Sequence, residues 1–256
     1  MIHTNPSIFN GNLSEFLASN QPFYACPMHR ARNILGLPFA AGNGHPFTEG
    51  MIDYLNDSTL KASHTRMKKF YDRFQPTTLF DALFQTRDHP LIKSLSDETI
   101  KPLTDISSKD YLVPWVEEAI PMGGFGQNMP KDEGSHYLGP VSHRHLFSEY
   151  ERIKSVVNSI RRHGFDVAKQ TDTIRGYFLT HNDDTVCIIV GGNHRVGALA
   201  ALKSDTIPVE RHPDRPTLVT LDQLLDWPMV QSGRFSPDLA KAVFLRFFSS
   251  ALKPLI

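Results

Sequence analysis

The sequence predicts an α+β fold in which a small mixed β-sheet packs against helices. An entirely apolar run at residues 186–190, rich in β-branched side chains, indicates a strand that is buried on both faces. A Gly-Gly pair ends this run, and small apolar side chains at helical spacing then indicate a short helix over residues 193–203. Residues 142–163 show the amphipathic pattern of a longer helix, and residues 173–180 indicate a strand that pairs with the apolar run as a hairpin.

The N-terminal flank, residues 1–104, is expected to be helical and interrupted by prolines. Residues 1–50 are rich in Asn, Pro and Gly, which favours irregular structure with short helices. Helices are expected at residues 49–55 and 58–74, and the second carries an apolar stripe at three- and four-residue steps. The cations on the other side of that helix fit either a solvated surface or a phosphate-binding face. Nothing in this flank identifies a reaction.

Glycine and proline are concentrated at residues 109–139. Long ordered loops in compact proteins frequently bind ligands, and the Gly-rich residues 123–126 could bring the backbone close to one. A linker is equally compatible with this composition. The stretch is not a Walker A loop, because no Gly-Lys-Ser or Gly-Lys-Thr follows.

The predicted core spans residues 105–215, and residues 216–256 are expected to form helices that pack on it. The helix over residues 142–163 should end at Gly164, because glycine is common immediately after the last helical turn. The closing segment shows its clearest helical pattern at residues 237–252.

The candidate site is the turn formed by Gly191, Gly192, Asn193, His194 and Arg195. A helix that begins after a glycine-rich turn offers unpaired N–H groups and the positive end of its dipole to an anion. Asn193 is a candidate N-cap, and the side chains of His194 and Arg195 could reach the same phosphate or carboxylate. The alternative is a plain strand–turn–helix whose glycines only make the turn and whose Arg195 pairs with a structural carboxylate.

This stretch resembles the Gly-x-His-Arg box of the ParB/sulfiredoxin-like superfamily, in which a strand, the turn, an Ala-rich helix and an Ile-Pro-Val strand follow one another. The matching residues are, in order, 192–195, 198–202 and 207–209. Upstream, residues 139–142 stand where the family often has an Asn-Pro-Arg segment, and residues 149–153 and 158–165 resemble its amphipathic helix. The resemblance covers about residues 137–210 and implies a ParB/sulfiredoxin-like sheet with helical segments on both sides.

The resemblance also implies a nucleotide-binding protein that holds phosphates on this turn. Some members of the superfamily look like small-molecule kinases that use a carboxylate as base, so we expect phosphoryl transfer from ATP or ADP to a small molecule, with Mg²⁺ as cofactor. The candidate catalytic residues are Glu149 and Glu151, on the helix that faces the phosphate site in the family. Ser142 and Arg144 are candidates for contacting phosphate or substrate. Glu149 could instead form an ordinary ion pair with Arg152.

Two other activities of the superfamily fit this chain poorly. Sulfiredoxins carry a catalytic Cys where this chain has Asn193, and Asn cannot form the adduct that their chemistry requires. ParB proteins bind CTP at the turn and read DNA with a later helical domain, but the short segment after Val209 shows no helix-turn-helix pattern and no basic cluster. A non-catalytic nucleotide-sensing or DNA-associated ParB-like module remains the alternative, and a scaffold that binds neither ligand is a third hypothesis.

Charge and cysteine content indicate the class of partner and the compartment. Lys plus Arg equals Asp plus Glu at 27 each, so nucleic acid is not expected as a partner. The two cysteines, Cys26 and Cys187, exclude a disulfide framework and fit a reducing cytoplasm. No leader pattern opens the sequence and no apolar run has membrane-spanning length. We therefore expect a cytoplasmic protein with a small-molecule substrate and no membrane partner.

Neither metal ligation nor thiol chemistry is expected from the sequence. His143 and His145, which lie near His136 in the sequence, would point apart on a helix, and no Cys or carboxylate stands at an established zinc spacing. Cys187 lies in the middle of the apolar strand, where a thiol is normally inert. The predicted site therefore contains phosphate-binding and catalytic residues but no metal ligands.

Overall fold

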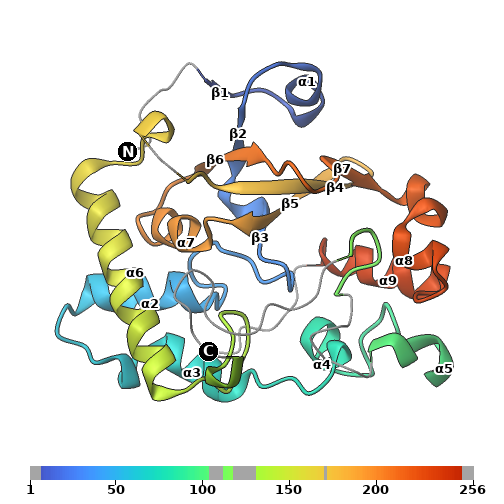
Figure 1. Ribbon diagram of the computed structural model, residues 1–256, viewed down its shortest axis with the longest axis horizontal. Coiled ribbons are helices and arrows are strands. Elements are labelled where there is room, and N and C mark those ends of the chain that lie inside the picture. Colours follow the sequence, from blue (N-terminus) through green and yellow to red (C-terminus); the bar gives the residue numbers. More distant parts are fainter. Residues whose placement is uncertain (1–6, 104–111, 118–130, 170–171, 250–256) are drawn as a thin grey trace.

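The chain folds around one mixed β-sheet, seen in a computed structural model that describes residues 7–103, 112–117, 131–169 and 172–249 (Figure 1). Within these ranges seven strands run in the order β1-β2-β6-β4-β5-β3, and β7 pairs with β4 off this path. The strands are β1 (Ile8–Phe9), β2 (Phe23–Pro27), β3 (Ala31–Arg32), β4 (Arg175–His181), β5 (Asp184–Gly191), β6 (Thr206–Arg211) and β7 (Leu218–Thr220). The β4–β5 and β2–β6 pairs are antiparallel, and the β1–β2, β3–β5, β4–β6 and β4–β7 pairs are parallel. The predicted α+β class and mixed sheet are confirmed.

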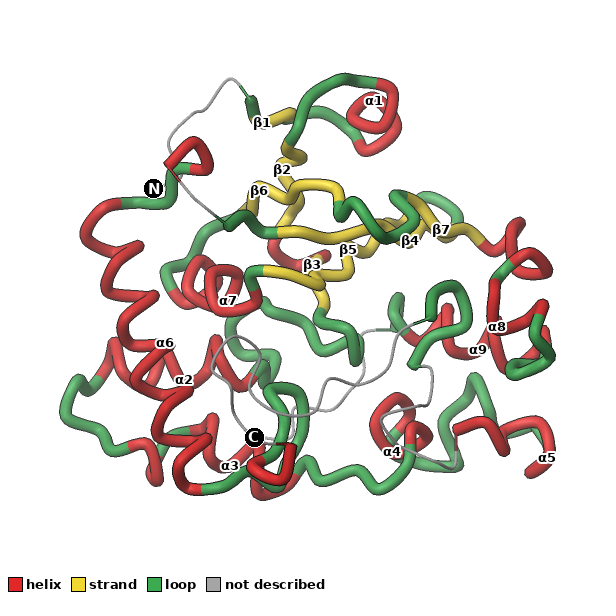
Figure 2. Tube along the Cα trace, in the orientation of Figure 1, coloured by secondary structure: helices red, strands yellow, loops and turns green. Residues whose placement is uncertain are grey.

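Helices lie on both sides of this sheet (Figures 1 and 2). Their bounds are α1 (Leu13–Ala18), α2 (Pro46–Asn56), α3 (Arg66–Arg73), α4 (Leu79–Phe84), α5 (Asp97–Ile100), α6 (His143–His163), α7 (Asn193–Ala201), α8 (Pro228–Gln231) and α9 (Pro237–Arg246). In Figure 1, α2, α3 and α4 lie below the sheet and α1 lies above it, while α6 runs down one side of the molecule. The sheet is therefore the central layer, and side chains on both of its faces can be buried.

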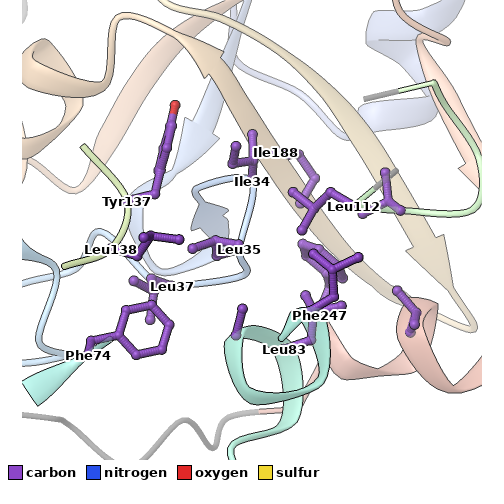
Figure 3. Close-up of a cluster of buried hydrophobic side chains, with 14 of the residues drawn as sticks. Ile34, Leu35, Leu37, Phe74, Leu83, Leu112, Tyr137, Leu138, Ile188 and Phe247 are labelled. Atoms are coloured by element: carbon purple, nitrogen blue, oxygen red, sulfur yellow. The ribbon is translucent and has the colours of Figure 1, made fainter. Parts of the chain in front are cut away.

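Strand β5 contributes to a hydrophobic core on each face of the sheet. Val186 and Ile188 belong to the larger core, which also contains side chains of α2, α3, α6 and α9. Cys187 and Ile189 belong to the smaller core, which contains Phe16 of α1. Figure 3 shows part of the larger core, where Ile188 gathers with side chains from distant parts of the chain. The prediction of a strand buried on both faces is confirmed.

The long helix was predicted correctly. α6 spans His143–His163, Ser142 caps its first turn by accepting the backbone N–H of His145, and Gly164 follows its last residue with a positive φ of 72°. Positive φ is easily adopted by glycine, which explains the stop. The predicted hairpin is also present, as the antiparallel pair of β4 and β5.

The N-terminal flank was expected to hold irregular structure and short helices, but its residues before 35 also supply the strands β1, β2 and β3. β2 pairs with β6, a strand that lies far away in the sequence, and Tyr24 stands opposite Val209. The strand conformation of β2 therefore depends on a partner that the short sequence of β2 does not reveal. The helix expected at residues 58–74 is interrupted, since Thr65 begins α3 by accepting the backbone N–H of Lys68.

The C-terminal flank begins with β7, which extends the sheet beside β4, at residues whose sequence also fits a short strand or a lead-in to the helices. A 3-10 helix at Leu221–Asp226 and α8 precede α9, which ends at Arg246 rather than near residue 252. Much of the glycine-rich stretch predicted as a loop or linker, including residues 123–126, lies outside the described residues.

Candidate functional site

The candidate site lies where α6 packs against α7, and Glu149 of α6 is its central residue. The Glu149 side chain is completely buried, with an exposed fraction of 0%. Its Oε2 atom lies 2.7 Å from Nε2 of His194 and 3.3 Å from Nδ1 of His136. The alternative, an ion pair with Arg152, is only marginal, since the Arg152 Nη1 atom lies 4.0 Å from Oε1 of Glu149. Glu149 therefore contacts the predicted phosphate-binding turn through His194.

Glu149 is held in its ionised form. Burial alone would raise the pKa of this carboxyl, but hydrogen bonds from His136 and His194 outweigh burial and lower its pKa below the ordinary value. An ionised carboxylate can only accept hydrogen bonds, so Nε2 of His194 donates to Oε2 of Glu149. The site thus contains a buried negative charge beside the first turn of α7.

His194 is fixed by contacts on two sides. Its ring stacks on the ring of Phe47 from α2, with centroids 4.3 Å apart and an angle of 15° between the planes. Burial lowers the pKa of His194, and the hydrogen bond to Glu149 opposes this shift without reversing it. His194 is therefore a neutral imidazole at neutral pH, and its orientation is set by Phe47 and Glu149 together.

Two further histidines lie beside this pair. His136 is buried, and its ring lies 5.8 Å from that of His194 at a right angle and 5.5 Å from that of His145. His145, one turn before Glu149 on α6, has an exposed fraction of 0%. Within the described part of the chain, neither ring nitrogen of His145 has a hydrogen-bond partner. Burial, followed by the proximity of His136, lowers the pKa of His145, so this ring is also neutral at neutral pH.

The turn itself differs in one detail from the prediction. Gly192, not Asn193, is the N-cap of α7, and its φ of 80° lies in the left-handed region that favours glycine. Asn193 is the first residue of the helix, and its Nδ2 atom donates to the hydroxyl of Tyr137 over 3.1 Å. Gly191 ends β5, so the chain passes from strand to helix within two residues.

Arg195 forms an ion pair in the structure. Its Nη1 atom lies 3.0 Å from Oδ2 of Asp172, and the two side chains are 25% and 59% exposed. This is the structural pairing that the sequence left open as an alternative to phosphate binding. Because the pair is partly exposed, it is weak, and an incoming phosphate could replace Asp172 as the partner of Arg195.

Three predicted site residues are directed elsewhere. Glu151 pairs with Lys154 on the solvent side of α6, at 2.5 Å. The Ser142 hydroxyl donates to Glu133 over 2.8 Å, and Arg144 pairs with the same carboxylate at 3.2 Å. In the described part of the chain no contact joins these three residues to the turn, so the structure brings only Glu149 to the predicted phosphate-binding residues.

The group of His136, Glu149 and His194 could hold a metal ion. One ligand atom from each of the three residues lies within 4.8 Å of the other two. The sequence did not predict this group, because the three residues come from a loop, from α6 and from α7 and have no recognisable spacing. The only sequence signal was that His194 belongs to the Gly-x-His-Arg box and that Glu149 lies on the helix expected to face it.

Comparison with known proteins found no matching family model, no matching curated protein and no matching solved structure. The resemblance to the ParB/sulfiredoxin-like superfamily therefore rests on the sequence motifs alone. Among the described residues, no helix is both long enough and apolar enough to cross a membrane.

Proposed function

We propose that this chain binds a nucleotide through its phosphates at the turn between β5 and α7 and transfers a phosphoryl group from ATP or ADP to a small molecule. The proposal includes a ParB/sulfiredoxin-like origin for the β5–α7 segment. The observation that carries it is the 2.7 Å contact between Glu149 and His194, which joins an ionised carboxylate to the first turn of α7. Such a carboxylate next to the predicted phosphate site is the arrangement that the motif resemblance implies.

Three features of the turn favour phosphate binding. Gly192 has no side chain to cap the first N–H groups of α7, and the positive end of the helix dipole lies at the same place. The left-handed Gly192 lets the backbone begin the helix directly after the strand. Arg195, three residues after Gly192, supplies a guanidinium whose present partner, Asp172, is exposed.

Glu149 is better suited to positioning His194 as an ionised carboxylate than to acting as a general base. A base that accepts a proton at neutral pH needs a pKa near the working pH, whereas the hydrogen bonds of Glu149 lower its pKa. Its complete burial also separates it from an acceptor substrate. In this proposal Glu149 positions His194, while phosphoryl transfer is accelerated mainly by positioning and charge neutralisation, to which Mg²⁺ on the nucleotide contributes.

Thermal stability of the purified protein tests the proposal. With Mg²⁺ present, ATP, ADP, CTP and GTP are compared for their ability to raise the melting temperature. Arg195→Ala should weaken binding of the preferred nucleotide about tenfold or more, because a charge-assisted phosphate contact contributes at least ~1.5 kcal/mol. Arg144→Ala is the matched control, since Arg144 is 74% exposed and pairs with Glu133. Asp172→Asn removes the ion pair of Arg195 but keeps the cation, and should bind the nucleotide at least as well as the unmodified chain.

Transfer is then followed with γ-labelled ATP or β-labelled ADP and a panel of small hydroxyl compounds. Labelled product that requires Arg195 supports the kinase function. Binding without any labelled product supports the alternative, a non-catalytic nucleotide-sensing module, and salt-dependent retention on DNA would indicate a DNA-associated one. If none of the nucleotides raises the melting temperature, the proposal is wrong.

A further inference from the structure

We propose that His136, Glu149 and His194 form a binding site for a divalent transition-metal ion. The inference goes beyond the proposed function, because it concerns metal bound by protein side chains in the absence of any nucleotide. It starts from geometry. Metal–ligand bonds of about 2.0–2.2 Å place neighbouring ligand atoms roughly 3 Å apart. The Glu149 oxygen lies 2.7 Å from the His194 nitrogen and 3.3 Å from the His136 nitrogen, close to that separation.

The hydrogen bond between Glu149 and His194 is compatible with this site. Metal ligands are deprotonated, and in a metal-free protein a proton between two ligands occupies the space of the ion. A metal could take the place of this proton if the proton of neutral His194 moved from Nε2 to Nδ1, and one carboxylate oxygen and two imidazole nitrogens would then be free to bind it, all within 4.8 Å of one another. The three side chains have exposed fractions of 0–13%, so water competes little for these positions.

Unsatisfied polar atoms around the same point are the second observation. Within the described part of the chain, Oε1 of Glu149 itself and both ring nitrogens of His145, whose ring lies 5.5 Å from that of His136, are buried without a hydrogen-bond partner. Buried polar groups are nearly always paired, so several unpaired ones in one place indicate a missing ligand or water. His145 lies beside His136, where it could orient that ligand or become a fourth one.

The donor set indicates the class of metal. Mg²⁺ and Ca²⁺ prefer oxygen ligands, whereas imidazole nitrogen suits zinc, iron and their neighbours in the first transition row. Two histidines and one carboxylate are typical of catalytic zinc and of non-haem iron(II), and both leave coordination positions open. Because His194 belongs to the first turn of α7, the metal would be held next to the turn that is proposed to bind phosphate. A bound metal could then polarise a phosphate oxygen or a water molecule there.

The test is metal binding by the full-length, tag-free protein. The protein is stripped with a chelator and titrated with Zn²⁺, Co²⁺, Fe²⁺ without oxygen, and Mg²⁺, and bound metal is measured by elemental analysis and by the visible spectrum of Co²⁺. We expect about one equivalent of a transition metal per chain, and much weaker binding of Mg²⁺. His136→Ala and Glu149→Gln should each weaken transition-metal binding at least about tenfold.

The control variant is His143→Ala, because His143 is an exposed histidine on the same helix. It should bind metal as the unmodified chain does. Failure of the stripped, folded wild-type protein to bind any of the three transition metals overturns the inference, whatever the variants do. Equal binding by His136→Ala, Glu149→Gln and His143→Ala would also overturn it, since the metal would then occupy another site. No nucleotide is present, so neither outcome depends on the proposed function.

Discussion

Glu149 on α6 and His194 on α7 lie 45 positions apart in the chain, yet Nε2 of His194 is hydrogen-bonded to Oε2 of Glu149 at 2.7 Å. This contact links the long amphipathic helix to the turn that follows β5. Because the carboxylate is buried and ionised, its surroundings stabilise a charge that would otherwise be costly to bury. The same contact is used by both proposals, so its removal is the first change to make.

Glu149→Gln should lower the free energy of unfolding by about 1.5–3 kcal/mol at pH 7, the usual contribution of hydrogen bonds to a charged group. Glutamine has nearly the same size, but it lacks the charge that two histidines contact. Urea unfolding in the presence of a chelator measures the change without a contribution from metal. Glu151→Gln is the control, because Glu151 is half-exposed and should matter by less than about 0.5 kcal/mol. If the two variants lost equal free energy of unfolding, the buried charge of Glu149 would contribute no more to stability than the half-exposed charge of Glu151.

Gly192→Ala should destabilise the chain more than Gly42→Ala. Both glycines have a φ near 80°, so alanine brings a similar backbone strain of about 1–2 kcal/mol at each position. At Gly192 an added Cβ would also lie 3.0 Å from Cα of Ile174 and 3.2 Å from the carbonyl oxygen of Thr173, whereas at Gly42 nothing lies within 4 Å. Overpacking of this kind adds roughly 1–3 kcal/mol.

The two variants are compared by urea unfolding under the same conditions. A larger loss for Gly192→Ala means that the backbone of the turn is held tightly against the segment before β4. A loss no greater than that of Gly42→Ala would show that the turn relaxes easily, and it would weaken the case for a preformed phosphate site.

Local sequence patterns predicted the elements that carry the site. The apolar run of β5, the Gly-Gly turn and the amphipathic pattern of α6 depend on neighbouring residues, so periodicity and glycine content identified them. The expectation that Glu149 faces the turn came from the motif resemblance, and the contact with His194 is consistent with it. Glu151 was a candidate for the same reason, but a helix places residues two positions apart on different sides.

What could not be predicted depends on contacts between distant segments. Nδ1 of His136, in the loop before α6, lies 3.3 Å from Oε2 of Glu149, and no repeat or spacing in the sequence indicates this contact. Phe47 stacks on His194 from α2, a region in which the sequence identified no reaction. β2 is a strand because β6 pairs with it, which a five-residue pattern cannot reveal. Such contacts follow from packing of the whole chain rather than from local preference.

His45 should make the stability of the protein depend on pH in acid. Burial, followed by the proximity of His194, lowers the pKa of His45 to about 3 from its ordinary value of 6.5. Between these two values the unfolded chain binds a proton that the folded chain does not. The stability contributed by neutral His45 is therefore complete above about pH 6.5 and is lost as the pH falls from there towards 3, by at most about 1.4 kcal/mol per pH unit.

His45→Phe tests this linkage, because phenylalanine keeps an aromatic ring against Phe39, whose ring centroid lies 4.0 Å away, and cannot be protonated. Urea unfolding at several pH values from 4 to 7 should give a shallower decline for this variant than for the wild type. Parallel declines for wild type and His45→Phe would exclude His45 as a source of the pH dependence.

Binding of a transition metal should stabilise the folded chain. A ligand at about 100 times its dissociation constant adds about 2.7 kcal/mol, which corresponds to a rise of roughly 5–10 °C in the melting temperature for a domain of this size. We expect this rise when Zn²⁺ is added to the stripped protein, its reversal by a chelator, and little effect of Mg²⁺ at the same concentration. His136→Ala should lose most of the rise, because it removes one of the three proposed ligands. His143→Ala should retain it, since His143 is exposed. A rise of equal size in the two variants would mean that Zn²⁺ stabilises the protein from another site, and the buried group of His136, Glu149 and His194 would then have a purely structural role.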